Sequence, residues 1–134
     1  MFTLTNKSDY GLIIISKLVR RPEYIPLSKI VSQTQLPQRF IARIAADLVR
    51  SGILISKEGK DGGYRLAKDL DDITLFDFLT VFEPDLHIVK CQQPKYHCNF
   101  EYSCNHHAFF TKKLKNIFMQ ELRTWTLGDF ITNN

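Results

Sequence analysis

The only three cysteines of this 134-residue chain lie within 14 consecutive residues, at Cys91, Cys98 and Cys104. His107 follows the third cysteine after two intervening residues. An odd number of thiols in a chain without a secretory signal argues against a disulfide framework, so the group predicts a metal or redox site. Free structural cysteines are the alternative, which an irregular segment without periodic burial disfavours.

The spacing of the thiols bears on the metal group that they would bind. Thiolates bind zinc, copper(I) and iron-sulfur clusters. Zinc sites usually contain closely spaced cysteine pairs, and the sequence has none here. The long intervals favour an iron-sulfur cluster, in two-iron or four-iron form, with zinc as the alternative. A cluster held by three cysteines needs a fourth ligand, for which the sequence offers several candidates.

The chain carries a net charge of +4 at pH 7, and this charge is unevenly distributed. Residues 1–68 contain 12 Lys and Arg against 5 Asp and Glu, whereas residues 69–134 contain 6 against 9. A basic N-terminal half suits a polyanion such as DNA, and a solvated basic face is the alternative. The longest aliphatic run, Leu12–Ile15, is far too short to span a bilayer, so we expect a cytoplasmic protein without a membrane partner.

Three short helices are predicted between residues 9 and 52. In the first, apolar residues recur at three- and four-residue steps, and Ser8 is the expected N-cap. The residues that separate the helices and end the third are Pro22, Pro26, Pro37 and Gly52.

The period then changes to alternation over residues 53–57, followed by a glycine-rich turn and renewed alternation over residues 64–66. This pattern predicts a β-hairpin. Three helices followed by a hairpin predict a mainly α (α+β) fold, a winged helix-turn-helix. In such a fold the third helix enters the major groove and the hairpin reaches along the DNA backbone.

The C-terminal half is expected to contain helices and one irregular segment. Thr74 with Asp77 and Thr126 with Asp129 have capping-box spacing and predict helix starts. The irregular segment contains all three cysteines and is long enough to need an ordering partner. A long helix over residues 105–124 follows, with one apolar face.

The apolar face of this last helix can pack on its own domain or against a second copy. Because a winged helix has a small core and the stripe is long, we predict a homodimer. The predicted dimer residues are Phe110, Leu114, Ile117, Phe118 and Leu122. The predicted organisation is a DNA-binding domain (1–82), a cysteine-rich cluster-binding loop (83–104), and a dimerisation helix with a short C-terminal helix (105–134).

Double-stranded DNA is the predicted partner. Gln and Arg each form two hydrogen bonds with adenine and guanine in the major groove, and the candidates for base contacts are Gln35, Gln38, Arg39 and Arg43. The candidates for phosphate contacts are Ser28, Lys57, Lys60 and Arg65. A solvated surface position is the alternative for each residue alone, but fold, charge and position agree for the set.

Several segments together resemble a known family, namely residues 4–5, 7–12, 62–67, 73–75 and 126–130, with the cysteine cluster between the last two. The sequence is similar to the IscR/NsrR/RirA-type (Rrf-two) family of bacterial winged-helix regulators over nearly its whole length. It departs from the family pattern at Glu58, where members commonly have Arg, so Lys57 or Lys60 would take over that minor-groove contact. Ala42 stands where one branch has Glu, so that branch's base preference does not transfer.

The resemblance implies a dimeric regulator, repressor or activator, whose operator affinity depends on an iron-sulfur cluster. It implies sensing of iron-sulfur or iron status, nitric oxide or redox stress. His107 matches the branch with a histidine ligand, and Asp9 matches the branch in which the opposite subunit supplies an acid. His97 and His106 are further options.

Catalysis is not expected. The sequence contains no glycine-rich phosphate loop, no paired catalytic carboxylates and no nucleophile elbow. We therefore expect no small-molecule substrate. A zinc-stabilised DNA- or partner-binding module without a sensing role is the alternative function.

Overall fold

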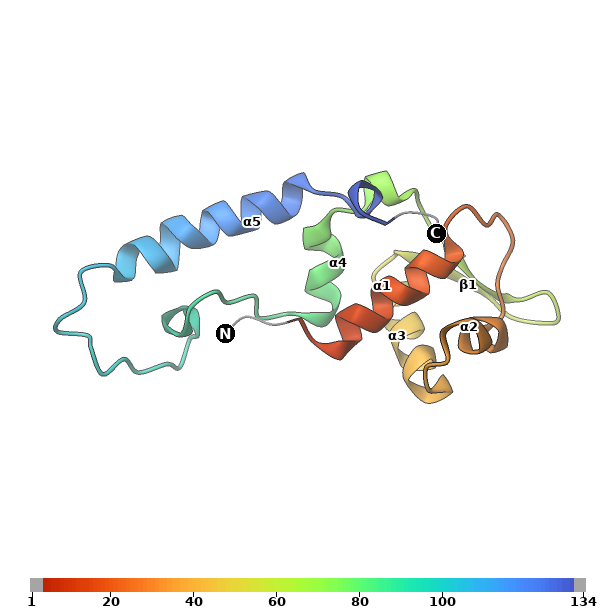
Figure 1. The fold of residues 1–134 in the computed structure, drawn as a ribbon, viewed down its shortest axis with the longest axis horizontal. Coiled ribbons are helices and arrows are strands. Elements are labelled where there is room, and N and C mark those ends of the chain that lie inside the picture. Colours follow the sequence, from red (N-terminus) through yellow and green to blue (C-terminus); the bar gives the residue numbers. More distant parts are fainter. Residues whose placement is uncertain (1–3, 132–134) are drawn as a thin grey trace.

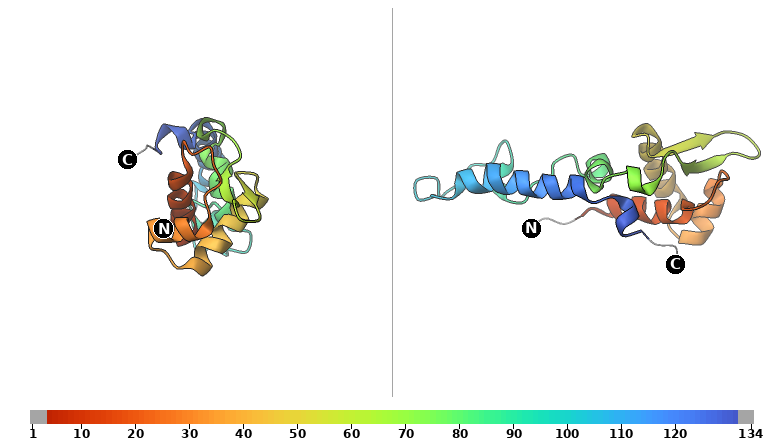
Figure 2. Two further views of the ribbon diagram at one scale, coloured as in Figure 1. Left: turned by 90° about the vertical axis from the view of Figure 1, so that its right-hand side faces the viewer. Right: turned by 90° about the horizontal axis from the view of Figure 1, so that it is seen from above.

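Two parts of different shape make up the chain in this computed structural model, which describes residues 4–131 (Figure 1). The body comprises residues 4–86 and 122–131, and the arm comprises residues 87–121. The wing hairpin of the body and the tip of the arm lie at opposite ends of the long axis, as both side-on views show (Figures 1 and 2). No helix between residues 4 and 131 is both long and apolar enough to cross a membrane.

The body contains the predicted winged helix. Its elements are α1 (Asn6–Leu18), α2 (Leu27–Thr34), α3 (Gln38–Arg50), β1 (Leu54–Lys57), β2 (Gly63–Leu66), the 3-10 turn η1 (Leu70–Asp72) and α4 (Leu75–Phe82). The first three helices bury their aliphatic stripes against one another, and the fully buried members include Ile14, Ile15, Ile30, Ile41, Ile44 and Leu48. Three helices followed by a hairpin confirm the predicted fold class.

The start of α1 differs from the prediction. Thr5, not Ser8, is the N-cap residue, and the helix begins at Asn6. Ser8 is fully buried inside the first turn, where its hydroxyl donates to the Glu83 carboxylate at 2.9 Å. Because Glu83 lies 75 residues away, no local pattern in the sequence reveals this contact.

The wing is an antiparallel pair in which Leu54 faces Leu66 and Lys57 faces Gly63. Tyr64 also pairs with Ile25, two residues before the start of α2, through two backbone hydrogen bonds of 2.8 Å. Gly63 has a φ of 144°, and a side chain there would collide with the Ile25 carbonyl. The wing is therefore fixed at its base to the helix-turn-helix.

Helix α5 (Leu114–Thr124) returns the chain to the body, where it packs against α4. Thr74 caps α4 by accepting from the Asp77 amide at 3.0 Å, as predicted. Thr126 and Asp129 form the second predicted capping box, which opens a single 3-10 turn, η4 (Leu127–Asp129). Leu127 is fully buried, so the turn η4 is anchored in the body core.

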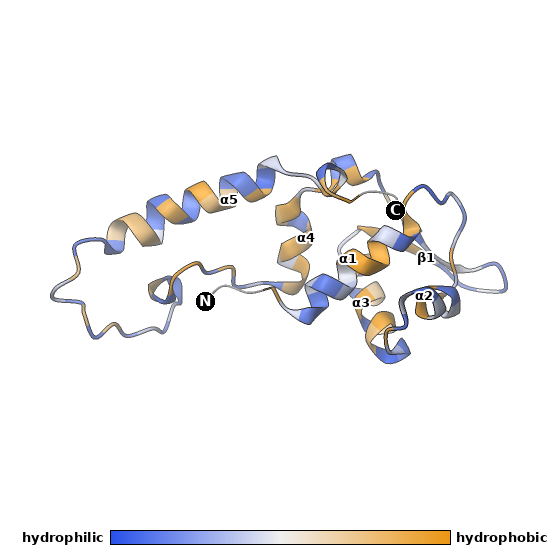
Figure 3. Cartoon of the chain, in the orientation of Figure 1, coloured by the Kyte–Doolittle hydropathy of each residue, from blue (hydrophilic) through white to orange (hydrophobic). Residues whose placement is uncertain are grey.

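The arm has little regular structure before its helix. A single 3-10 turn, η2 (Lys90–Gln92), interrupts the predicted irregular segment. The helix begins at residue 107, not 105, and opens with the π-helical turn η3 (Phe109–Lys113) before α5. Apolar and polar residues alternate along it (Figure 3). Between residues 87 and 121 no side chain is buried, so the arm lacks a core of its own.

Candidate DNA-binding surface and metal site

Helix α3 presents a polar face opposite its buried one. Ile41, Ile44 and Leu48 hold the helix on the core, and this leaves Gln38, Arg39, Arg43 and Gln35 exposed. Gln35 ends α2 in the left-handed conformation, with φ of 58°. The four predicted base-contact residues therefore gather around the turn and first half of the recognition helix, where a helix-turn-helix meets base edges.

The predicted phosphate contacts form a second group. Ser28 is exposed in the first turn of α2, and Lys57 and Lys60 are exposed on the wing. Arg65 differs, because it is half-buried and its guanidinium donates to the Pro22 carbonyl at 3.5 Å. Arg65 is thus held by its own chain, whereas the other three residues are exposed.

Tyr24 organises the wing cations, a role that the sequence did not suggest. The Arg65 guanidinium lies 4.8 Å from the centre of the Tyr24 ring, and the Lys57 ammonium lies 5.6 Å from it. Both distances fall within the range of cation–π attraction. The ring thereby holds two positive groups together on the side of the wing nearest α2.

The three cysteines line one cavity in the arm, of about 400 Å³. Its other lining residues are Tyr96, His97, Glu101, His106 and His107. All three thiols are free and half-buried. The three cysteines therefore lie near one another in space as well as in sequence. Glu101 and Tyr96 also line the cavity, which the sequence did not predict.

The donor set fits a thiolate-ligated metal group in kind and place. Three soft sulfur donors, three imidazoles and one carboxylate surround a single cavity. Among residues 4–131, however, no three such side chains converge tightly enough to hold one metal ion. The surroundings are loop backbone, where for example the Phe100 amide donates to the Cys98 sulfur at 3.4 Å. Ligand binding would therefore have to draw the loop together.

The two candidates for the fourth ligand lie in different places. His107 lines the cysteine cavity at the first turn of the arm helix, and His97 and His106 line it too. Asp9 is exposed in the first turn of α1 and does not line the cavity. Of the predicted candidates, only the histidines line the cysteine cavity within one chain, while the resemblance assigns Asp9 to the opposite subunit.

Glu83 connects the start of α1 to the point where the chain leaves α4. One carboxylate oxygen accepts from the Thr5 amide at 2.7 Å and from the Ser8 hydroxyl at 2.9 Å. Burial raises the pKa of Glu83, but the hydrogen bonds from Thr5 and Ser8 lower it more, so its pKa lies below the ordinary value of 4.5. The carboxylate therefore stays ionised near neutral pH.

The predicted dimer residues divide into two groups. Ile117 is 47% exposed, and Phe110 and Leu114 are half-buried on the arm helix. Phe118 is half-buried and packs against the body core, and Leu122 is only 6% exposed within that core. Leu122 is thus buried by its own chain, because α5 docks on α4 there. Phe110, Leu114 and Ile117 therefore form a partly exposed apolar surface on the outer half of the helix.

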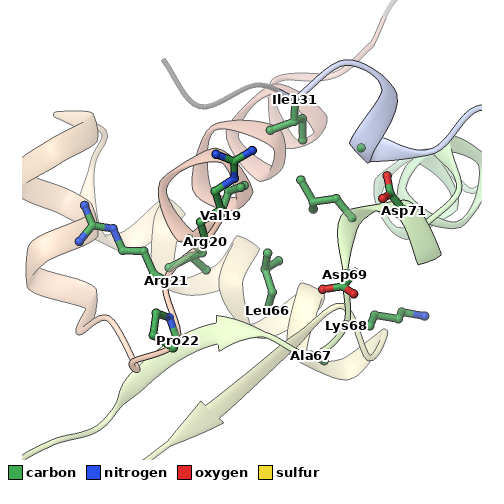
Figure 4. A pocket seen from close by; sticks show the side chains of 13 residues that line it. Val19, Arg20, Arg21, Pro22, Leu66, Ala67, Lys68, Asp69, Asp71 and Ile131 are labelled. Carbon is green, nitrogen blue, oxygen red and sulfur yellow. The ribbon is translucent and has the colours of Figure 1, made fainter.

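A larger cavity, of about 660 Å³, lies at the base of the wing (Figure 4). Leu66 and Ala67 of the wing, Arg20 after α1, and Asp69 and Asp71 are among its walls. Arg20 adopts a φ of 59°. No pattern in the sequence predicts this cavity, because its walls come from three separate segments.

A match to a family model decides where the chain belongs. The model described as "Rrf2: Iron-dependent Transcriptional regulator" matches residues 4–133. The chain belongs to the Rrf2 family. The expected resemblance is therefore confirmed, and this Rrf2 protein is a DNA-binding transcriptional regulator and not an enzyme.

Solved structures share the fold of this Rrf2 protein. CymR (YrzC), the global cysteine regulator of B. subtilis, is 21% identical, with a TM-score of 0.73, 100% of this chain and 99% of that chain covered. A putative transcriptional regulator from Listeria innocua is 24% identical, with a TM-score of 0.75 and coverage of 96% and 85%. T. potens IscR is 23% identical, with a TM-score of 0.66 and coverage of 97% and 86%.

Proposed function

We propose that this Rrf2 protein is a cytoplasmic, dimeric, sequence-specific regulator whose operator affinity is set by an iron-sulfur cluster in the arm. Cys91, Cys98 and Cys104 supply three ligands, and His107 or the partner subunit's Asp9 supplies the fourth. The signal is iron-sulfur or iron status, nitric oxide or redox stress. The observation that carries the proposal is the gathering of all three thiols around one cavity, in a chain matched by an iron-dependent regulator family.

The arm residues are suited to hold a labile group. The three sulfurs are half-buried, not enclosed, so small oxidants and nitric oxide have access to them. A cluster bound there supplies a reactive iron-sulfide centre that such molecules destroy. Shared ligation by these residues would also draw the loop against the first helical turn.

The position of the arm allows cluster binding there to change the affinity of the protein for DNA. Helix α5 carries the exposed dimer surface at one end and docks on α4 at the other. In a dimer, the direction of this helix sets the separation of the two α3 helices. Because half-sites on DNA are one helical repeat apart, a small change in that separation alters operator affinity.

The first test is the composition of the protein purified without oxygen. We expect visible absorption together with iron and acid-labile sulfide, lost in Cys91→Ala, Cys98→Ala or Cys104→Ala. Ser103→Ala, an exposed neighbour in the same loop, is the matched control and should keep the colour. Colourless protein with stoichiometric zinc would instead establish the zinc-stabilised module.

The second test separates the candidates for the fourth ligand. If His107 is a ligand, His107→Ala shifts the visible spectrum and Asp9→Ala leaves it unchanged. If Asp9 is the ligand, the spectral change follows Asp9→Ala and appears only in the dimer. Asp9 is exposed, so its replacement should not disturb the fold of α1.

A further inference from the structure

The side chain of Gln92 bridges the cysteine segment and the arm helix. Its Oε1 accepts from the Ile88 amide at 2.7 Å. Its Nε2 donates to the Phe110 carbonyl, also at 2.7 Å, across 18 residues of sequence. Both bonds are short and the side chain is half-buried. In an arm without a core, such a bridge is a main determinant of how the loop meets the helix.

The chemistry of the two partners requires an amide at this position. A backbone N–H only donates and a backbone carbonyl only accepts, so the orientation of the Gln92 amide is fixed by its surroundings. A carboxylate would keep the bond from Ile88 but would place a negative oxygen against the Phe110 carbonyl. An apolar side chain would leave both backbone groups without this partner.

The two ends of the bridge lie at positions that matter for the proposed function. Gln92 follows Cys91 within the same 3-10 turn, η2, whose backbone is closed by the Gln92 amide on the Val89 carbonyl at 3.1 Å. Phe110 lies in the π-helical turn η3, where the Leu114 amide reaches back five residues to Phe109. Such wide turns inside helices often occur at functional sites.

We propose that Gln92 is the positioning residue that couples Cys91 to the first turns of the arm helix. Movement of Cys91 moves the η2 turn, and the Gln92 amide transmits this movement to the Phe110 carbonyl. The dimer surface on the same helix shifts in consequence. This inference rests on the proposed function for its meaning, but the bridge itself is testable without any bound metal.

The test compares Gln92→Glu with Gln93→Glu, a matched change at the exposed neighbouring residue. In the metal-free protein, amide hydrogen exchange over residues 107–114 should accelerate roughly tenfold in Gln92→Glu at neutral pH, while α3 is unaffected. Gln92→Ala, which also lacks the donor to the Phe110 carbonyl, should accelerate exchange of the same amides. Gln93→Glu should match the wild type throughout.

A second measurement addresses coupling. If the protein binds a cluster, Gln92→Glu and Gln92→Ala should keep the visible spectrum but reduce the ratio of operator affinities between cluster-loaded and cluster-free protein. Unchanged exchange in both Gln92 variants, or equally fast exchange in Gln93→Glu, overturns the inference. Absence of any cluster in the wild type overturns the proposed function alone, since the exchange result stands independently.

Discussion

The body and the arm are built on opposite principles. The body buries a continuous aliphatic and aromatic core, in which Phe78 is fully enclosed and Gly11 of α1 leaves room for it beside Phe82. The arm buries nothing completely, and it exposes large aromatics such as Phe100, at 73%, and Tyr102. The same chain therefore combines a closed core in the body with an open arm. All three cysteines lie in the arm.

The contrast indicates a division of labour. Burial of apolar surface stabilises the body without help from a ligand, so the DNA-reading surface is available whatever the state of the arm. In the proposed function, further order in the arm comes from a second copy along the helix and from a metal group in the cavity. Under that proposal, sensing is separated from folding.

Truncation of a large aromatic should distinguish the two regions most strongly. Phe78→Ala removes a fully buried ring that meets Phe82 at 5.6 Å between centroids, and it should lower the free energy of unfolding by about 3 to 5 kcal/mol. Phe100→Ala in the arm should change it by less than about 0.5 kcal/mol. Urea denaturation measures both. Equal losses would show that the arm has a core after all.

A charged dimer surface should separate association from folding. Leu114→Asp with Ile117→Asp should give a folded monomer and weaken operator binding roughly 100-fold or more, because the second half-site contact is no longer tethered. Phe118 is unsuitable for this test because it packs against the body core. Sedimentation velocity and circular dichroism report the result, with Asn116→Asp as the exposed control. A persistent dimer would contradict the assignment of this surface.

Base and phosphate contacts should differ in their dependence on sequence. Arg39→Ala should weaken operator binding by about 1 to 3 kcal/mol and affect random DNA less, whereas Lys60→Ala should weaken both equally and reduce the salt dependence. Lys113→Ala, an exposed cation of the arm, should affect neither. Fluorescence anisotropy at several salt concentrations tests all three. Equal losses on both DNAs for Arg39→Ala would exclude base reading by this residue.

Glu83, at the junction of body and arm, should give the smallest effect. Its pKa in the folded state lies below the ordinary value, so its stabilisation is fully present above about pH 4.5 and is lost as the pH falls through the lowered pKa. Glu83→Gln should therefore be less stable than wild type at pH 7, by up to about 1 kcal/mol, and this difference should shrink as the pH falls through the lowered pKa of Glu83. A difference independent of pH would indicate that the carboxylate charge is not involved.

Sequence patterns predicted the body better than the arm for a physical reason. The helices, the hairpin and the caps at Thr74 and Thr126 depend on residues within a few positions of one another, which periodicity and spacing reveal. Ser8 was misassigned as an N-cap because its partner, Glu83, is 75 residues away. Leu122 was assigned to the dimer because helical periodicity marks an apolar face without showing what covers it.

The candidate site shows the same limit. The close spacing of the cysteines predicted that they gather, and all three line one cavity; the predicted base-contact residues are exposed. The bridge from Gln92 to Phe110 and the position of Tyr24 beneath Arg65 involve pairs distant in sequence. Such contacts follow from the tertiary structure, and single-sequence patterns do not contain them.

The most direct test of the central claim compares operator affinity for the same dimer with and without its cluster. Both forms are prepared without oxygen and titrated against operator DNA at matched salt. We predict that the affinities differ by about 1 to 3 kcal/mol, or roughly 5- to 150-fold, and that Cys98→Ala behaves like the cluster-free form. Equal affinities for the two wild-type forms would contradict the account and leave the arm a structural role only.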